Sequence, residues 1–298
     1  MPFSAKPVSA CRAIMALAAC CLLGAARPAL AQPSIWVVHG KTCTITLFGS
    51  IHVLPAGLNW EPPALAKALA HADELWFEIP LGANEQAQAA SKAQLRGALP
   101  EGQSLSALMS PEGARRLSAF AAQHRLSPAK LNHMQPWYAD LIVSSFAYAQ
   151  SGGAVQDGVE DQLAQAAPQA PRKAFETAEQ QIDIIADAPQ RAQVASLEAS
   201  LREAATDPDE YARLVDAWMR GDGAEIYRHD ILTLRRDAPA LFQILITQRN
   251  AAWTRVLDQR LTGAGNVVVV VGAAHLLGPD GVPAQLRALG YQVDGPKD

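Results

Sequence analysis

The sequence predicts an α/β fold in which two related β-containing halves form one core and a large helical insertion lies between them. Segments rich in β-branched and aromatic residues cluster near both ends of the chain, at 34–48, 74–79 and 267–271. The region from about 84 to 250 instead has the apolar spacing of helices and is rich in Ala, Gln and Leu. The same short motif, Gly-x-x-His, follows a β-prone run in each half. The two ends of the chain are therefore expected to meet in one sheet.

The N-terminal half begins with a predicted hairpin. Residues 34–38 and 43–48 flank the turn-like His39-Gly40-Lys41. A short helix is expected at 62–72 and a strand at 74–79, which Pro80 ends. The order hairpin, helix, strand is typical of half of an α/β core.

The middle of the chain predicts a series of helices interrupted by one short strand at 172–175. Ser110 is the expected N-cap of the helix at 111–124, and Thr177 with Gln180 or Gln181 fits another cap. The remaining helices are expected at 85–99, 105–109, 137–149, 159–167, 178–188, 193–205, 209–220 and 239–261. After them, the uninterrupted valines at 267–271 predict a central strand buried on both faces. A helix at 281–288 and a strand at 291–293 complete the chain.

Residues 1–31 are expected to be a signal peptide, which leaves a single domain at 32–298. Lys6 and Arg12 precede an apolar stretch at 13–26, and Ala29-Leu30-Ala31 fits a cleavage site. The protein is then periplasmic or secreted. In the alternative, Cys20 is the acylated residue of a lipoprotein, and only then is a membrane an expected partner.

Removal of this leader changes the composition. The net charge goes from −4 to about −7, and only Cys43 of the four cysteines remains. An intrachain disulfide and a cysteine-based zinc site are thereby excluded. The acidic balance, without a basic run, argues against nucleic acid. A peptide or small-molecule substrate is the expected partner.

The paired motifs are Gly49–His52 and Gly272–His275. Each histidine is expected just past the carboxyl end of a strand, where α/β sheets usually place their sites. Together the two imidazoles could bind a divalent metal or act as general bases. The alternative is that each histidine is a structural residue satisfied by backbone hydrogen bonds.

Other polar residues are candidates for the same site. Glu78, at the end of an apolar strand, is a candidate metal ligand or general base, and Arg249 could stabilise a developing oxyanion. Asn250, Glu160 and Glu176 are candidate substrate-binding residues. Structural alternatives are open for them: Glu160 and Asp161 could complement a helix dipole, and Glu176 precedes a capping segment. Ser50 is close to His52 in sequence but lies in no Gly-x-Ser-x-Gly elbow, so it is a poor nucleophile candidate.

Taken in order, these stretches resemble the TraB/GumN family, which is related to Tiki proteases and to erythromycin-esterase-like and ChaN-like proteins. The resemblance implies two halves that each give one Gly-x-x-His loop, with helices inserted between them. Tiki-type members are metal-dependent proteases of the Mn/Co kind, which implies His52, His275 and Glu78 as the metal centre. Two departures are that Glu160-Asp161 stands where the family usually has an aspartate, and Gln248 where a glutamate often precedes Arg-Asn. The resembling stretches are 47–55, 74–78, 135–137, 158–160, 175–180, 218–222, 249–250, 271–278 and 281–291.

Three functions are consistent with the sequence. The first is an exported metal-dependent hydrolase of peptide or amide-like bonds, in which His52 and His275 bind Mn, Co or Zn and Glu78 is a ligand or activates water. The second is a metal-free, esterase-like hydrolase in which one histidine is the general base and Glu78 its partner. The third is a non-catalytic periplasmic protein that binds a peptide or cofactor.

Overall fold

The computed structural model describes residues 33–166 and 170–297. The expected leader at 1–31 and the alternative lipidation site at Cys20 lie outside the described residues. Within the part of the chain that is described, no helix is long and apolar enough to cross a membrane.

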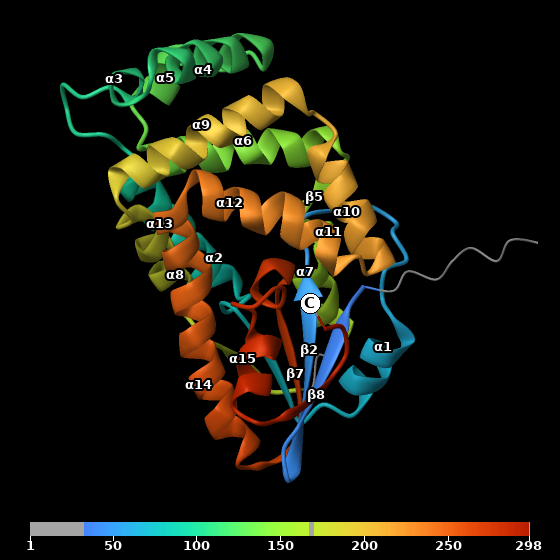
Figure 1. The fold of residues 1–298 in the computed structure, drawn as a ribbon. Helices are drawn as coiled ribbons and strands as arrows, with labels where there is room; N and C mark the ends of the chain where they lie inside the picture. The colour runs from blue at the N-terminus through green and yellow to red at the C-terminus, as the bar shows by residue number, and fades with distance from the viewer. Residues whose placement is uncertain (1–32, 167–169, 298) are drawn as a thin grey trace, which may run out of the picture. The chain divides into compact units, whose positions relative to one another are not determined.

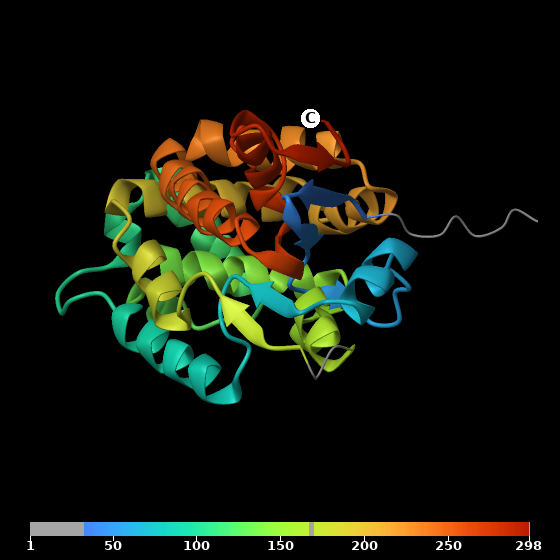
Figure 2. The same ribbon diagram turned by 90° about the horizontal axis from the view of Figure 1, so that it is seen from below.

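A six-stranded sheet joins the two ends of the chain (Figures 1 and 2). Strand β2 pairs in parallel with β7, and β4 lies in parallel between β7 and β6. Strand β1 is antiparallel to both β2 and β8. In sheet order the strands are β6 (Arg172–Ala174), β4 (Glu74–Phe77), β7 (Ala264–Gly272), β2 (Thr42–Ser50), β1 (Ile35–His39) and β8 (Gln292–Asp294), and a separate pair is β3 (Leu54–Pro55) with β5 (Gly153–Ala154).

The sequence predicted this central arrangement because its signals are local. The five valines of β7, Val267 to Val271, are each at most 1% exposed, as expected for a strand covered on both faces. The predicted hairpin forms between β1 and β2, with Val38 opposite Ile45. The predicted α/β fold class is confirmed.

Helices cover both faces of the sheet, and most of them come from the part of the sequence between β4 and β7. Figures 1 and 2 place α14 and α15 on one face and α1 on the other. The α-helices are α1 (Pro63–Ala70), α2 (Ala83–Arg96), α3 (Leu105–Leu108), α4 (Pro111–Gln123), α5 (Pro128–Asn132), α6 (Pro136–Gln150), α7 (Val159–Ala166), α8 (Ala178–Ala186), α9 (Gln190–Thr206), α10 (Glu210–Arg220), α11 (Gly223–Ile226), α12 (Leu232–Asp237), α13 (Pro239–Phe242), α14 (Arg249–Leu261) and α15 (Val282–Ala288).

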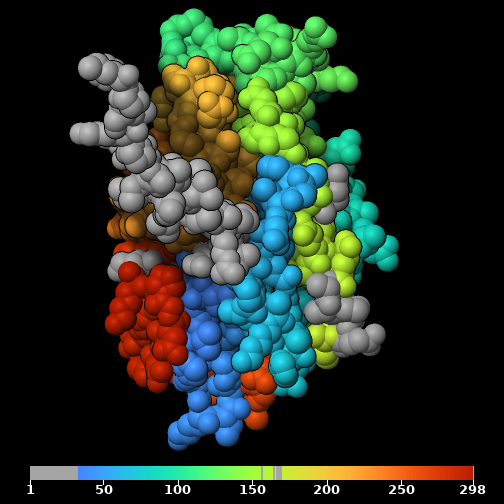
Figure 3. All heavy atoms as spheres, turned by 90° about the vertical axis from the view of Figure 1, so that its right-hand side faces the viewer, coloured from blue at the N-terminus to red at the C-terminus, as the bar shows by residue number. Residues whose placement is uncertain are grey.

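The helical insertion has a core of its own. Leu105, Phe120, Leu131 and Leu197 belong to a buried cluster that is separate from the cluster around the sheet. In Figure 1 these helices lie beyond the end of the sheet toward which β2 points. Figure 3 shows the same division on one face, with the blue and cyan residues below the green ones. The carboxyl ends of the parallel strands are therefore covered by the insertion.

Two helix starts have the predicted caps, whereas other parts of the helical region differ from prediction. Ser110 caps α4, and Thr177 with Gln180 forms a capping box at α8. The single helix expected at 239–261 contains a π-helical segment, Gln243–Gln248, between α13 and α14. Helix α5 was not predicted, nor were α11 and α12 with the π-helical segment Tyr227–Ile231 between them. A π turn adds a residue to the helical period, so a search for regular 3.6-residue spacing does not find it.

Candidate functional site

The two Gly-x-x-His motifs lie side by side at one edge of the sheet. In the β2–β7 pair, Gly49 is opposite Val271 and Ser50 is opposite Gly272. The neighbouring strand β4 is parallel to β7, and Glu78 directly follows its last residue. Three adjacent parallel strands thus bring their carboxyl ends together, which is where α/β folds place ligands and catalytic groups.

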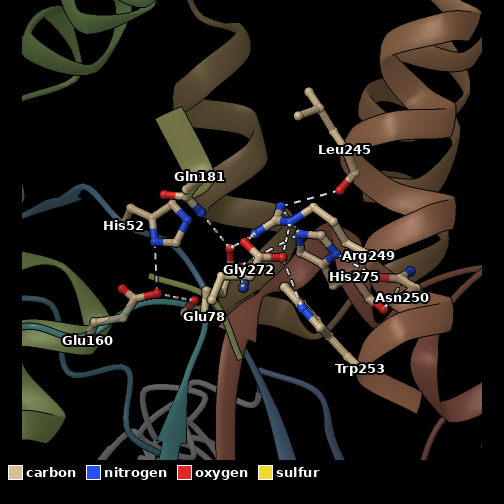
Figure 4. Close-up of polar contacts among 12 residues, drawn as sticks. His52, Glu78, Glu160, Gln181, Leu245, Arg249, Asn250, Trp253, Gly272 and His275 are labelled. Atoms are coloured by element: carbon tan, nitrogen blue, oxygen red, sulfur yellow. Dashed lines mark hydrogen bonds and ion pairs between the residues drawn. The ribbon is translucent and has the colours of Figure 1, made fainter. Parts of the chain in front are cut away.

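Three of the predicted site residues surround Gly272. A Cβ atom at this position would lie 3.1 Å from Glu78 Oε1, 3.6 Å from His52 Nε2 and 3.7 Å from His275 Cδ2. Figure 4 shows Glu78 between His52 on one side and His275 with Arg249 on the other. A Cβ here would be tight against Glu78 Oε1 and in ordinary contact with the two imidazoles, so Gly272 mainly leaves room for the Glu78 carboxylate.

Two other glycines allow backbone segments to approach the His52 loop. A Cβ on Gly49 would lie 3.0 Å from the Cα of Ala273, so the first motif packs directly on the second. A Cβ on Gly158 would overlap the backbone oxygen of His52. The amide of Val159 donates to Ile51 O at 3.2 Å, which holds the start of α7 against this loop.

His52 is paired with Glu160, the second residue of α7. Its Nδ1 lies 2.8 Å from Glu160 Oε1, which also accepts a 2.5 Å hydrogen bond from the Ser50 hydroxyl. The Glu160 carboxylate raises the pKa of His52 to about 9, so the imidazole is protonated at neutral pH. Ser50 is buried, and its hydroxyl donates to Glu160 rather than to His52. His52 is therefore not placed to take the proton of Ser50, as a nucleophilic serine would need.

Glu78 is buried but ionised. Its carboxylate accepts hydrogen bonds from Arg249 Nη2 at 2.7 Å, from the Gly272 amide at 2.7 Å and from Gln181 Nε2 at 3.2 Å. Burial alone would raise its pKa, but His275, Arg249 and the amide hydrogen bond lower the pKa of Glu78 to about 2.

Arg249 lies at the centre of a buried ionic network. Its Nε and Nη2 contact the two oxygens of Glu176 at 2.8 and 2.9 Å, and Nη2 also reaches Glu78. Trp253 donates to Glu176 at 3.1 Å, and its ring lies 4.7 Å from the guanidinium carbon. Glu176, proposed from sequence as a substrate contact, therefore holds Arg249 in place. Arg249 itself is only 9% exposed and already binds two carboxylates.

His275 is buried and held at both ring nitrogens. Its Nδ1 lies 2.6 Å from Asn250 Oδ1, and its Nε2 lies 3.1 Å from Arg249 Nη1. Burial lowers the pKa of His275 to about 4, so the ring is neutral at physiological pH although Glu78 is nearby. Asn250, expected from sequence to bind substrate, is 0% exposed and lies next to His275.

These donors do not fit a metal ion as they are arranged. Within residues 33–166 and 170–297, no group of three or more His, Cys, Asp and Glu side chains is placed to hold one. Arg249 Nη1 lies 3.1 Å from His275 Nε2 and Arg249 Nη2 lies 2.7 Å from Glu78 Oε2, so the guanidinium already occupies acceptor sites of both groups. Metal binding by His52, Glu78 and His275 would require Arg249 to move and His52 to lose its proton.

A pocket of about 170 Å³ opens onto His52 and Glu78. Its lining is partly apolar and partly acidic, and consists of His52, Phe77, Glu78, Ile79, Leu81, Gln86, Val155, Glu160, Asp161 and Gln181. The second acid after Gly158-Val159 thus also faces the pocket, while the first pairs with His52. Another cavity, of about 200 Å³, lies in the helical insertion and is lined by none of the motif residues.

A model of the TraB/PrgY/gumN family matches residues 34–295. The chain belongs to this family. The match confirms the resemblance noted from the motifs. This TraB/PrgY/gumN protein is 27% identical over 243 residues to the uncharacterized protein YbaP of Escherichia coli (strain K12), an alignment that covers 81% of this chain and 87% of YbaP. YbaP of Shigella flexneri gives the same values. No solved structure matches.

Two residues of the site were missed from the sequence. Trp253 follows Arg249 by four positions, which places both on one face of α14. This spacing is a signal from which Trp253 could have been predicted as a neighbour of Arg249. Gln181 donates to Glu78 from α8, but only its place in a cap was noted. No sequence pattern associates it with Glu78, because the contact joins two elements that are far apart in the chain.

Proposed function

We propose that this protein is an exported hydrolase that cleaves an ester or amide bond by acid–base catalysis between Glu78 and His52. The observation that carries the proposal is that one pocket wall holds an ionised carboxylate and a protonated imidazole. Environments that move the pKa values of two neighbouring groups in opposite directions are typical of assigned acid and base roles.

The proposed reaction uses both groups on one water molecule and one carbonyl. Glu78 accepts a proton as the water oxygen attacks the carbonyl carbon, and His52 donates its Nε2 proton to the departing oxygen or nitrogen as the bond breaks. Glu160 supports this role because it keeps His52 protonated, and Arg249 does so because it keeps Glu78 ionised. The apolar wall of Phe77, Ile79, Leu81 and Val155 would take the acyl or side-chain portion of the substrate.

The metal-dependent hydrolase and the non-catalytic binding protein are alternative outcomes of the same test. Mn, Co or Zn bound by His52, His275 and Glu78 would require the rearrangement of Arg249 described above. A protein that only binds a peptide or cofactor in the pocket would show no turnover.

The test uses purified protein, p-nitrophenyl acyl esters and a fluorogenic peptide library, with chelator or with added Mn²⁺, Co²⁺ or Zn²⁺. His52→Gln and Glu78→Gln should each lower kcat/KM by about 10²- to 10⁴-fold. His39→Gln is the matched control for His52, because His39 also pairs with a carboxylate, Asp294, at 2.8 Å outside the pocket. Glu74→Gln is the control for Glu78, since Glu74 begins the same strand.

Three results would contradict the acid–base assignment. The first is equal loss in His52→Gln and His39→Gln. The second is activity that disappears with chelator and returns with a metal, which would favour the metal-dependent alternative. The third is a rate that rises rather than falls as the pH passes about 9, the pKa of His52, since the proposal needs its protonated form. Absence of turnover under every condition would favour a binding role.

Export is part of the proposal and rests on the basic and apolar pattern of residues 1–31. Cell fractionation and N-terminal sequencing would test it. A mature protein that begins at Gln32 supports the soluble exported form, and an acylated Cys20 supports the lipoprotein. A cytoplasmic protein that retains Met1 would refute export.

A further inference from the structure

Two successive residues of α14 hold the two ring nitrogens of His275 (Figure 4). Arg249 Nη1 lies 3.1 Å from Nε2, and Asn250 Oδ1 lies 2.6 Å from Nδ1. The imidazole also packs on Trp253 of the same helix, with ring centroids 4.4 Å apart. The proposed reaction gives Asn250 no part, although Asn250 is completely buried and polar.

The orientation of the Asn250 amide is determined by its other contacts. Its Nδ2 lies 3.2 Å from the backbone oxygen of His275 and 2.8 Å from that of Asp280. Carbonyl oxygens only accept hydrogen bonds, so the NH₂ group must face them. The amide oxygen must then face His275 Nδ1.

This orientation selects one tautomer of His275. The Asn250 oxygen is only an acceptor, so Nδ1 must carry the hydrogen, and Nε2 of the neutral ring keeps its lone pair. Nε2 faces Arg249, whose guanidinium has donors and no acceptor. In the opposite tautomer both contacts would fail, because two donors would meet at Arg249 and two acceptors at Asn250.

We propose that Asn250 is a positioning residue: it holds His275 in the Nδ1–H tautomer, so that His275 accepts a hydrogen bond from Arg249 and keeps the guanidinium against Glu78. The contacts run without a break from Asn250 through His275 and Arg249 to Glu78 Oε2 in the pocket wall. The hydrogen-bonding claim is independent of catalysis, and only its consequence for turnover rests on the proposed function.

The test is a long-range ¹H–¹⁵N spectrum of the labelled protein near neutral pH, with His275 signals assigned from their loss in His275→Gln. The wild type should show one tautomer, with the hydrogen on Nδ1. Asn250→Leu should lose this pattern and populate both tautomers. Asn266→Leu, the same change at an exposed position of β7, is the matched control and should resemble the wild type.

An Nε2–H or mixed tautomer in the wild type would overturn the proposal, as would an Asn250→Leu spectrum like that of the wild type. If Asn250→Leu does not fold, the tautomer of the wild type decides the proposal by itself. Where turnover is measurable, Asn250→Leu should lower kcat with little change in KM. A wild type without turnover would refute the proposed function, whereas the tautomer would still decide this inference.

Discussion

Replacement of Arg249 by methionine is the most informative perturbation of the buried network. The side chains of Arg249, Glu78 and Glu176 are 9%, 7% and 11% exposed. Methionine fills much of the same volume but removes the guanidinium that pairs with both carboxylates. Breaking a buried ion pair by removal of one partner costs about 3–5 kcal/mol. Since domains of this kind are stable by about 5–15 kcal/mol, the loss should be a large share of the total.

The loss of stability in Arg249→Met should also depend on pH. In the wild type, the pKa of Glu78 is about 2 and therefore below its unfolded value, so this group stabilises the fold above about pH 4.5 and the contribution is lost as the pH falls through about 2. Without Arg249 the pKa of Glu78 should rise, so the folded variant can take up a proton more readily. The stability difference between wild type and Arg249→Met should therefore be largest near pH 7 and narrow as the pH is lowered.

Urea unfolding followed by circular dichroism at several pH values would measure this difference. Arg202→Met is the matched control, because Arg202 is 41% exposed and pairs with Asp237 at 2.6 Å. The Arg202→Met change should lower the free energy of unfolding by less than about 1 kcal/mol. Glu176→Leu added to Arg249→Met should recover part of the larger loss, since an apolar replacement of a whole buried pair is often tolerated. Equal losses in the two arginine variants, or a difference that does not change with pH, would refute the reasoning.

Three further predictions concern local contacts. Glu160→Gln should lower the pKa of His52 from about 9 toward about 6.5 in an NMR titration, and an unchanged pKa would disprove the pairing. In the wild type, the raised pKa of His52 stabilises the fold fully below about pH 6.5, and this contribution is lost as the pH rises through about 9. Gly158→Ala should cost about 1–3 kcal/mol in thermal unfolding, since its Cβ would overlap the backbone oxygen of His52, and a neutral result would show that the loop yields freely. Thr177→Ala removes the capping box with Gln180 and should cost about 1 kcal/mol in urea; no loss would mean that the cap is not needed.

The sequence predicted much of the core because those signals are local. The valine run at 267–271 identified a strand buried on both faces, and the pattern around His39-Gly40-Lys41 identified the hairpin. The repeated Gly-x-x-His motif pointed to one edge of the sheet, and the structure places His52 and His275 there beside Gly272.

The sequence did not indicate how the charges of the site are arranged. Arg249 and Glu78 are 171 positions apart, and Arg249 and Glu176 are 73 apart, yet they form one buried network. Apolar spacing records which face of a helix or strand is buried, whereas the meeting of two side chains from different elements depends on how those elements pack. The sequence by itself therefore determined the fold class, the caps and the candidate residues. Only the tertiary structure decided that Glu160 raises the pKa of His52, that Asn250 contacts His275 Nδ1, and that Arg249 contacts both Glu78 and His275, because each of these depends on contacts between distant segments.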